Sequence, residues 1–415
     1  MVKGLAGDRG SCRCGALSAA GVLGLSDCGM SIRGLTPLGR DTDRDAVKLS
    51  SNAGLTDGEV PLSLAHGNAA SLCELAVVNP LEQSGWDQRV ASDSNGALFH
   101  TTIWARVLQE TYGHKPVYIC QVSAGKFKRL LPIMEVSSPW TGRRGVSLPF
   151  TDICIPLSDS EHPREMYEFA MEQGRRRGWR YLECRGGNWE CRAVSPGLQF
   201  WGHVVDLEHG EASLFKRLGS AVRRGIRKAE RSGLQIEFSA EPAAMKEFYK
   251  LHCITRRRHG VPPQPWRFFE RIAATIMPRG HGFVATARSG NKPVAGAVFL
   301  QFGDEVVYKY AASDYDSQQL RANNLVLWTA LKRYAANGFK KLHLGRTSLS
   351  NEGLRRFKLG FGASEEKVQY FKYDFRKESF IGDTDRSSGW SSRFFRHTPF
   401  RILRLVGSIV YPHLS

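Results

Sequence analysis

A chain of 415 residues is too long for one ordinary hydrophobic core and long enough for two domains with terminal extensions. Its content of 42% hydrophobic and 10% aromatic residues excludes a wholly disordered protein. The formal net charge of +18 favours polyanionic partners, such as nucleic acid, phosphorylated precursors or an anionic membrane face, although it can also serve solubility alone.

The nine cysteines fit neither a disulfide framework nor a zinc site. Their number is odd and no CxxC pair occurs, so we predict reduced, mostly buried thiols in a cytoplasmic protein. No apolar run approaches the roughly 20 residues that a membrane-spanning helix needs. Glycine and polar residues interrupt the N-terminal segment, and a secretory signal is therefore not expected.

The first part of the chain carries weak structural signals. Residues 1–72 are rich in Gly, Ser, Ala and Asp and lack periodicity, which predicts a disordered leader. Alternatively, this segment is an overextended start and Met30 is the true initiator. The first strand-like segment is CELAVVNP, at residues 73–80.

From there the chain repeats one arrangement of elements. Each half has a β-hairpin, then a helix, a glycine and a strand. In the first half these are at 116–136, 161–177, Gly178 and 179–187. In the second half they are at 282–302, 321–337, Gly338 and 339–347. The two helix-ending glycines are 160 residues apart. This spacing predicts an α/β (α+β) fold of two duplicated domains with mixed sheets; two unrelated α/β domains are the alternative.

Between the halves lies a strongly basic segment, SLFKRLGSAVRRGIRKAERSG. Apolar residues recur in it at helical spacing and predict one amphipathic helix over 213–232. Seven cations, among them Arg223, Arg224 and Arg227, lie between the apolar positions, with Glu230 as the single acid. A phosphate-binding face and a solvated face are equally good interpretations.

The tail at 392–415 is both basic and apolar. One helical face carries Ile402, Leu405, Val406 and Ile409, and the opposite face carries Arg401 and Arg404. Such a helix can lie on an anionic membrane or pack back on the protein as a last core helix. We favour packing on the protein.

The usual catalytic motifs are absent, because the sequence contains no GxxxxGK[ST], HExxH or GxSxG and its twelve histidines lack metal-ligand spacing. The informative stretch is HLGRTSLSNEGLRRFKLGFGA, from His343 to Ala363. We expect a strand that ends at Gly345, then Arg346, a polar loop and a helical turn ending in Phe357-Lys358. These cations favour an anionic or acyl-bearing ligand.

Together these segments resemble the FemAB-like acyltransferases, which are built from two tandem GNAT-like domains. The resemblance covers about residues 75–375. It rests on AVRRGIRKAERSGL (221–234), the block at 308–347 and GLRRFKLGFGA (353–363), with 98–114 and 148–157 in the first half. Proteobacterial members linked to exopolysaccharide and exosortase systems are the most similar in type.

The resemblance implies four parts of the chain. After the leader at 1–72 come a GNAT-like domain on the acceptor side at 73–205 and a GNAT-like domain on the donor side at 206–375. The basic amphipathic tail follows at 376–415.

The resemblance also implies transfer of an acyl or aminoacyl group to an amine of a cell-envelope precursor, either peptidoglycan or exopolysaccharide. The donor, aminoacyl-tRNA or acyl-CoA, is a co-substrate, and no metal or redox cofactor is expected. We expect a cytoplasmic protein, with tRNA and the inner face of the cytoplasmic membrane as further partners to consider. Two rivals stay open: an acyl-CoA-dependent N-acetyltransferase of small amines, and a non-catalytic protein that binds polyanions at the envelope.

The Phe-Lys pair after Gly353 matches the family's pair in type and context. By this resemblance Lys358 positions the donor ester or stabilises its oxyanion, and Phe357 lines the site. The alternative is that Phe357 is core and Lys358 is exposed to solvent. Asp314 is either the base that takes a proton from the attacking amine or a turn residue.

Three further residues of the second half are candidates for substrate binding. Arg346 either contacts a phosphate or carboxylate of the ligand or forms a structural salt bridge. Tyr310 precedes the same strand end as Asp314 and lies in the family-like block. Asn324 is either a helix cap or a polar group of the site.

On the acceptor side, Asp152 and Trp104 fall in segments that resemble the family. Arg106 stands where bridge-forming relatives tend to carry a lysine, which puts recognition of the same sugar-nucleotide peptide in doubt. The approach to the second-half helix, at 317–325, lacks the glycines of the usual pyrophosphate loop and so disfavours acetyl-CoA. The long coiled-coil arm of those relatives is also absent, so a bound tRNA would need another surface.

Overall fold

The computed structural model describes residues 74–158, 164–187, 196–382 and 391–414. The predicted leader at 1–72 and the candidate initiator Met30 lie outside these ranges. Four of the nine cysteines, Cys120, Cys154, Cys184 and Cys253, lie inside them, and all four are buried free thiols as expected. No helix within the described ranges is long and apolar enough to cross a membrane.

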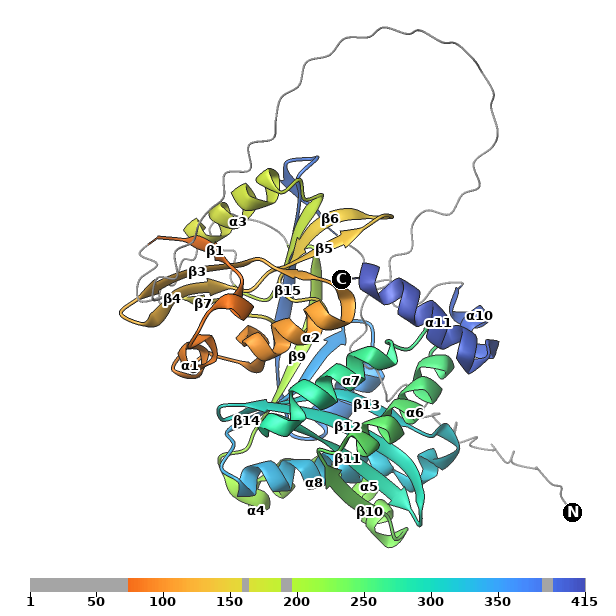
Figure 1. The fold of residues 1–415 in the computed structure, drawn as a ribbon. Coiled ribbons are helices and arrows are strands. Elements are labelled where there is room, and N and C mark those ends of the chain that lie inside the picture. The colour runs from red at the N-terminus through yellow and green to blue at the C-terminus, as the bar shows by residue number, and fades with distance from the viewer. Residues whose placement is uncertain (1–73, 159–163, 188–195, 383–390, 415) are drawn as a thin grey trace, which may run out of the picture.

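One twelve-stranded mixed sheet runs through both halves of the chain (Figure 1). In spatial order its strands are β10 (Gln235–Ser239), β11 (Gly282–Ser289), β12 (Lys292–Phe302), β13 (Glu305–Ser313), β14 (Lys341–Ser348), β9 (Leu198–Asp206), β15 (Ser364–Asp374), β8 (Tyr181–Arg185), β6 (Gly142–Val146), β5 (Met134–Ser138) and β2 (Lys115–Pro116), and β16 (Ser379–Phe380) pairs with β15. Most neighbours are antiparallel, and the pairs β13–β14 and β6–β8 are parallel.

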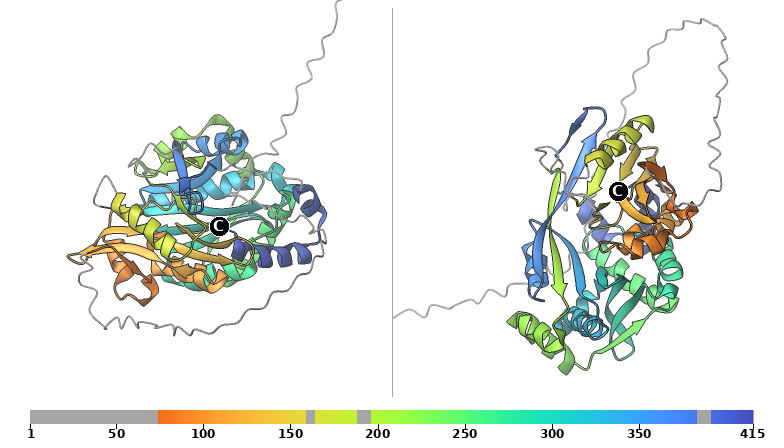
Figure 2. Two further views of the ribbon diagram at one scale, coloured as in Figure 1. Left: turned by 90° about the horizontal axis from the view of Figure 1, so that it is seen from above. Right: turned by 90° about the vertical axis from the view of Figure 1, so that its left-hand side faces the viewer.

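The two halves exchange strands at the middle of this sheet. β9, from the end of the first half, pairs with β14 of the second half, whereas β15, from the end of the second half, pairs with β8 of the first. β9 and β15 also pair with each other, and Figure 2 shows these long strands joining the halves. The predicted division at 205/206 stays a prediction, because the sheet is continuous across it.

A separate four-stranded sheet belongs to the first half. Its order is β1 (Ala76–Val78), β3 (Tyr118–Ser123), β4 (Lys126–Leu131) and β7 (Leu157–Ser158). The predicted first-half hairpin is β3–β4 in this sheet, while its second-half counterpart, β11–β12, lies in the large sheet. The chain therefore repeats the order of its elements without placing the two hairpins equivalently.

Helices cover both faces of the second-half strands. The helices are α1 (Trp86–Ala91), α2 (Thr102–Tyr112), α3 (Arg164–Arg176), α4 (Gly210–Arg217), α5 (Ser220–Arg231), α6 (Pro242–Arg258), α7 (Trp266–Thr275), α8 (Ala322–Ala336), α9 (Glu352–Leu359), α10 (Ser391–His397) and α11 (Phe400–Val410). Val284 and Ala285 alternate on β11 and belong to different core clusters, one with α6 and α7 and the other with α5 and α8. This two-sided cover agrees with the expected mixed α/β architecture.

The predicted basic helix over 213–232 is wrong as a single helix. α4 ends at Arg217 and α5 begins at Ser220. At the break, the Gly219 N–H donates to the carbonyl of Gly360, at 2.8 Å. A Cβ on Gly219 would lie 3.4 Å from the Gly360 Cα, so the break follows from the close approach of the turn after α9.

The tail packs back on the protein, as we favoured, but with the face opposite to the expected one. Leu403 and Gly407 of α11 are buried, and α11 contacts α6. The residues predicted to form the packed face, including Ile402, Leu405 and Ile409, are largely exposed. Because α11 carries apolar side chains on both of its faces, the sequence pattern did not show which face would be buried.

Candidate active site

A bulge in β14 shapes the site. The register of β14 against β9 shifts between His343 and Arg346, and Gly345 between them has the left-handed φ of +72°. The predicted end of the strand at Gly345 is therefore wrong, because β14 continues to Ser348 with Gly345 inside it. On the other edge, the parallel ladder with β13 ends at the Val307–His343 pair. The bulge thus lies beyond the last ladder pair of the two parallel strands.

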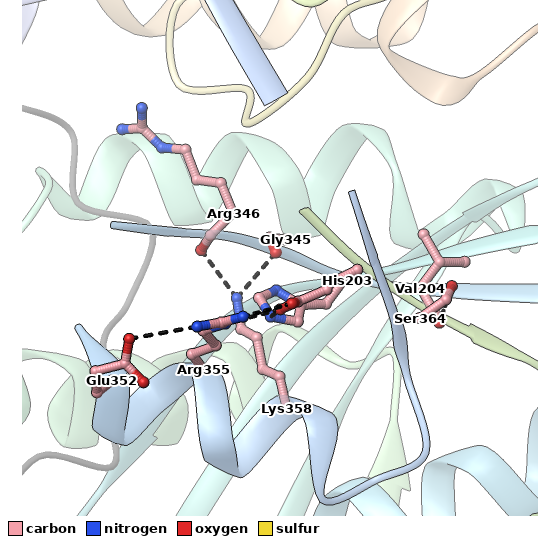
Figure 3. A network of polar contacts seen from close by, with 9 residues as sticks. His203, Val204, Gly345, Arg346, Glu352, Arg355, Lys358 and Ser364 are labelled. Carbon is pink, nitrogen blue, oxygen red and sulfur yellow. Dashed lines mark hydrogen bonds and ion pairs between the residues drawn. The ribbon is translucent and has the colours of Figure 1, made fainter. Parts of the chain in front are cut away.

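Lys358 of α9 reaches this bulge. Its Nζ donates to the carbonyl oxygens of Gly345 and Arg346, each at 2.9 Å (Figure 3). The side chain is 4% exposed, so the alternative of a solvent-exposed lysine is not observed. Asn351 begins α9 by accepting a hydrogen bond from the Leu354 N–H, which fixes the helix that carries the lysine.

Burial sets the charge of this lysine. It lowers the pKa of Lys358 to about 7, with Asp152 acting in the opposite direction and Arg346 adding to the decrease. The ammonium and the free amine are both populated at neutral pH. Two of the three N–H donors of the ammonium are bound to the strand carbonyls, and no acceptor is seen for the third among the described residues.

Asp152 brings the first half of the chain to the same place. Its Oδ1 lies 3.7 Å from Nε of Arg346, whose guanidinium stacks 4.1 Å from the ring centre of Phe200 and 5.1 Å from that of Tyr370. Tyr370 also donates its hydroxyl proton to the Asp152 carbonyl. Figure 3 shows the Arg346 side chain running away from Lys358. This arrangement is the structural salt bridge that the sequence allowed as one role of Arg346.

The loop that delivers Asp152 has unusual backbone angles. Leu148 and Phe150 are buried and have φ values of +54° and +63°, which bulky residues rarely adopt. The hydroxyl of Thr151 donates to the Leu148 carbonyl and helps to hold the turn. Such strain is often found where a side chain must be placed accurately.

His203 of β9 packs beside Lys358 and was not singled out from the sequence. Its Nε2 lies 3.7 Å from Oε2 of Glu365, which also binds Arg355 of α9 through two hydrogen bonds of 2.6 and 2.9 Å. Burial first, and Lys358 second, lower the pKa of His203 to about 4. The imidazole is therefore neutral at pH 7, and the Arg355–Glu365 pair fixes α9 to β15.

Replacing Gly345 with alanine is expected to abolish the arrangement around Lys358. A Cβ at Gly345 would lie 2.5 Å from Oδ2 of Asp152, and alanine disfavours the positive φ. We expect a loss of stability of about 1–3 kcal/mol and a loss of activity, measured by thermal unfolding and by transfer assays. Gly290→Ala is the matched control, since Gly290 has a φ of +57° in open space. Equal effects of Gly345→Ala and Gly290→Ala would contradict the proposed clash between a Cβ at position 345 and Asp152.

Lys358 also predicts a pH dependence of stability. Its pKa is about 7 in the folded protein and near 10.5 in the unfolded chain, so the unfolded chain holds the proton more tightly between these values. The free energy of unfolding, relative to that of Lys358→Met, should rise with pH by roughly 1 kcal/mol per unit above pH 7. Denaturant titrations from pH 6 to 9 measure it. If the difference in unfolding free energy between the two proteins does not change over this pH range, the pKa of Lys358 is not lowered in the folded protein.

A second feature is a basic cavity between α6, the end of β13 and α10. Its volume is about 400 Å³, and it is lined by Ile254, Thr255, Arg257, Arg258, Ser313, Asp314, Tyr315, Asp316 and Arg396. Within the described ranges, no carboxylate lies within 4.0 Å of the guanidinium groups of Arg257, Arg258 or Arg396. Arg258 lies over the Tyr315 ring, 4.8 Å from its centre. The lining therefore carries three arginines and two carboxylates, those of Asp314 and Asp316.

Comparisons with known proteins agree with this geometry. The family model described as "Acetyltransferase (GNAT) domain" matches residues 216–368, which include β14 and Lys358. The crystal structure of FemX superposes with a TM-score of 0.58 at 15% identity, covering 73% of this chain and 98% of FemX. The UDP-N-acetylmuramoylpentapeptide-lysine N(6)-alanyltransferase of Weissella viridescens is 24% identical over 94 residues, which are 23% of this chain. Residues 216–368 thus match the GNAT domain family, and the chain as a whole resembles the FemAB-like enzymes in fold.

The match spans only 28% of the length of the Weissella viridescens relative. The likeness to FemX shows that the two chains share a fold. The finer placement among exopolysaccharide- and exosortase-linked members stays a prediction.

The two residues of the Phe-Lys pair have different surroundings. Phe357 is buried, and its ring centre lies 5.1 Å from that of Phe361, within the second-half core. Leu354 belongs to the same cluster. Phe357 thus supports α9 from the core side, and its role in lining the site stays a prediction.

Asp314 is used in a turn. Its carboxylate accepts from the Asp316 N–H at the start of the 3-10 helix Tyr315–Leu320 and from Nζ of Lys292, at 2.7 Å. The hydrogen bond to Lys292 lowers the pKa of Asp314, which makes it a poor base. The geometry favours the turn role. Tyr310 lies in an aromatic cluster, with its ring centre 5.3 Å from that of Phe269.

Trp104 and Arg106 of α2 are not among the groups around Lys358. Trp104 is fully buried and makes edge contacts with the rings of Phe99 and Phe268. Arg106 is half-exposed and lies 4.0 Å from Glu110, one helical turn on. Both residues thus contact other side chains of the protein, and their role in acceptor binding stays a prediction.

The capping role expected for Asn324 is wrong. The residue at the N-cap of α8 is Arg321, with a φ of +58°, and Asn324 lies inside the first turn. Its side chain faces Gly225 of α5, where an added Cβ would lie 3.1 Å away. Nearby on α5 are the three predicted phosphate-binding cations, of which Arg224 and Arg227 are exposed and Arg223 is half-buried.

Proposed function

We propose that this chain transfers an acyl or aminoacyl group to an amine of a cell-envelope precursor in the cytoplasm. The observation that carries the proposal is the buried Lys358 Nζ. Two strand carbonyls hold it, its pKa is about 7, and its third N–H has no acceptor among the described residues. A lysine in this setting can donate to an oxygen that gains negative charge.

The proposed reaction is attack of the acceptor amine on the carbonyl carbon of the donor ester. A C–N bond forms as the ester C–O bond breaks, and the proton lost by the amine ends on the released alcohol. The tetrahedral intermediate carries an oxyanion, to which the Lys358 ammonium donates its remaining N–H. Because the site is buried, this hydrogen bond is stronger than it would be in water. The reaction balances without a redox or metal cofactor.

Aminoacyl-tRNA is the donor that we favour. The segment at 317–325, before α8, lacks the glycines of a pyrophosphate-binding turn, which argues against acyl-CoA. The exposed cations of α5, Arg224 and Arg227, provide a surface for a nucleic-acid backbone. The Weissella viridescens relative is named for alanine transfer to a muramoylpentapeptide lysine, and a peptidoglycan or exopolysaccharide amine is accordingly the proposed acceptor.

The test offers radiolabelled aminoacyl-tRNA and acyl-CoA in parallel to the purified chain, with soluble and lipid-linked envelope precursors as acceptors. Label that moves from tRNA to a precursor, and is lost in Lys358→Ala, supports the proposal. Label that moves only from acyl-CoA supports the rival N-acetyltransferase. If neither donor reacts, while charge reversal of Arg224 and Arg227 abolishes polyanion binding, the non-catalytic rival takes its place.

A further inference from the structure

Helix α11 has two apolar faces. The inward face carries Leu403 and Gly407, and Tyr411 follows at the helix end; all three are buried. The outward face carries Ile402, Leu405 and Ile409, which are 50%, 59% and 49% exposed. A surface helix of a globular protein usually turns polar residues outward, so the outward face needs an explanation.

The inward contacts fix α11 in this orientation. A Cβ on Gly407 would lie 2.1 Å from the Pro263 carbonyl oxygen, so the helix packs directly on the chain after α6. The Tyr411 hydroxyl donates to the Pro262 carbonyl, at 3.2 Å, and accepts from Nη2 of Arg256, at 2.8 Å. Turning the helix to bury its outward face would break these contacts.

Exposed apolar side chains concentrate on this corner of the molecule. Four of the eight large exposed hydrophobic residues in the described ranges lie on α10 and α11, namely Phe394, Ile402, Leu405 and Ile409. α10 and α11 lie together at one edge of the molecule, beside α6 (Figure 1). At the far end of α11, the exposed Trp140 ring lies 4.5 Å from that of His413. Trp at such a position is typical of a membrane–water interface.

The charged side chains of α10 and α11 themselves are all positive, whereas Asp314 and Asp316 line the neighbouring cavity. Arg396, Arg401 and Arg404 are exposed on α10 and α11. No Asp or Glu follows Asp385 in the printed sequence, so residues 386–415 offer no acidic side chain to these arginines. Cations flanking an apolar face match an anionic lipid surface, where the arginines meet headgroup phosphates. A second copy of this positively charged face would repel it.

We propose that α10 and α11 form a docking surface for an anionic lipid bilayer. Ile402, Leu405 and Ile409 enter the boundary between headgroups and acyl chains, and Arg401 binds headgroup phosphates. This inference does not rest on the proposed transfer reaction. If both hold, the surface brings the enzyme to lipid-linked acceptors.

The test is sedimentation of the full chain with vesicles of phosphatidylglycerol and phosphatidylcholine, or of phosphatidylcholine alone. We expect binding to the anionic vesicles that weakens as salt rises. The double change Ile402→Ser with Leu405→Ser should weaken it by at least about tenfold, and Arg401→Glu should weaken it too. Ile155→Ser is the matched control, because Ile155 is an equally exposed isoleucine away from the helix. Thermal unfolding confirms that each variant is folded.

Two outcomes would overturn the proposal. In the first, the folded double variant binds anionic vesicles as the wild type does, and charge reversal at Arg224 removes binding, which would place the lipid surface on α5. In the second, the wild type does not bind vesicles and sedimentation velocity shows self-association that the double variant loses. The outward face would then be an interface between copies of the chain.

Discussion

Replacing Lys358 with methionine lowers the rate of transfer at saturating substrate concentrations by about 10²- to 10³-fold. This is the usual effect of removing one donor to the oxyanion of an acyl-transfer reaction. Methionine fills the buried space without a charge, so the fold should persist and the desolvation of the ammonium is avoided. Single-turnover kinetics with a labelled donor measure the change directly.

Lys377→Met is the matched control, because Lys377 is exposed on the turn between β15 and β16. It should leave the rate unchanged. The affinity for the acceptor should also stay within about twofold in Lys358→Met, since the lysine acts on the intermediate rather than on the bound substrate. A Lys358→Met enzyme with full activity would remove the lysine from the mechanism.

Replacing Asp152 with alanine destabilises the protein by about 3 kcal/mol. The change deprives the buried Arg346 guanidinium of a carboxylate at 3.7 Å, and breaking one side of a buried ion pair costs far more than breaking an exposed one. Because Asp152 raises the pKa of Lys358, its loss should also lower that pKa further. Denaturant titration measures the first effect, and the pH dependence of single-turnover rates measures the second.

The control for Asp152→Ala is Asp304→Ala, which removes an exposed ion pair with Lys340 and should leave the stability close to that of the wild type. Combining Asp152→Ala with Arg346→Met should recover part of the lost stability, because the buried cation is then removed as well. Equal destabilisation by Asp152→Ala and Asp304→Ala would show that the Asp152–Arg346 contact does not hold the halves together.

The sequence indicated candidate site residues one at a time but did not predict which of them lie together. Lys358 was singled out because the Phe-Lys pair after Gly353 resembles the family's pair, and the alternative of an exposed lysine is wrong. The meeting of Asp152 with Arg346 depends on the exchange of β9 and β15 between halves. Strand exchange joins segments that are about 200 residues apart, and no local periodicity encodes it. His203 gave no signal, since one histidine in a strand has many possible surroundings.

Tertiary contacts also explain the wrong element predictions. The spacing of apolar residues over 213–232 favours one helix, and only the contact between Gly219 and Gly360 divides it. In α11, periodicity identified an apolar face but gave no sign of which face would be buried. Gly407, which makes the closest inward contact, does not count as apolar in such a pattern. Because Gly407 has no Cβ, this side of α11 can approach the chain closely, and that contact decides which face of the helix is buried.

The measurement that most directly tests the role of Lys358 is the affinity for a phosphonate analogue of the tetrahedral intermediate. Its tetrahedral, negatively charged group stands in for the oxyanion that Lys358 is proposed to stabilise. If Lys358 stabilises the oxyanion, Lys358→Met weakens analogue binding by the same factor as it lowers the transfer rate, with acceptor affinity unchanged. Unchanged analogue binding in a Lys358→Met protein that has lost transfer would contradict it.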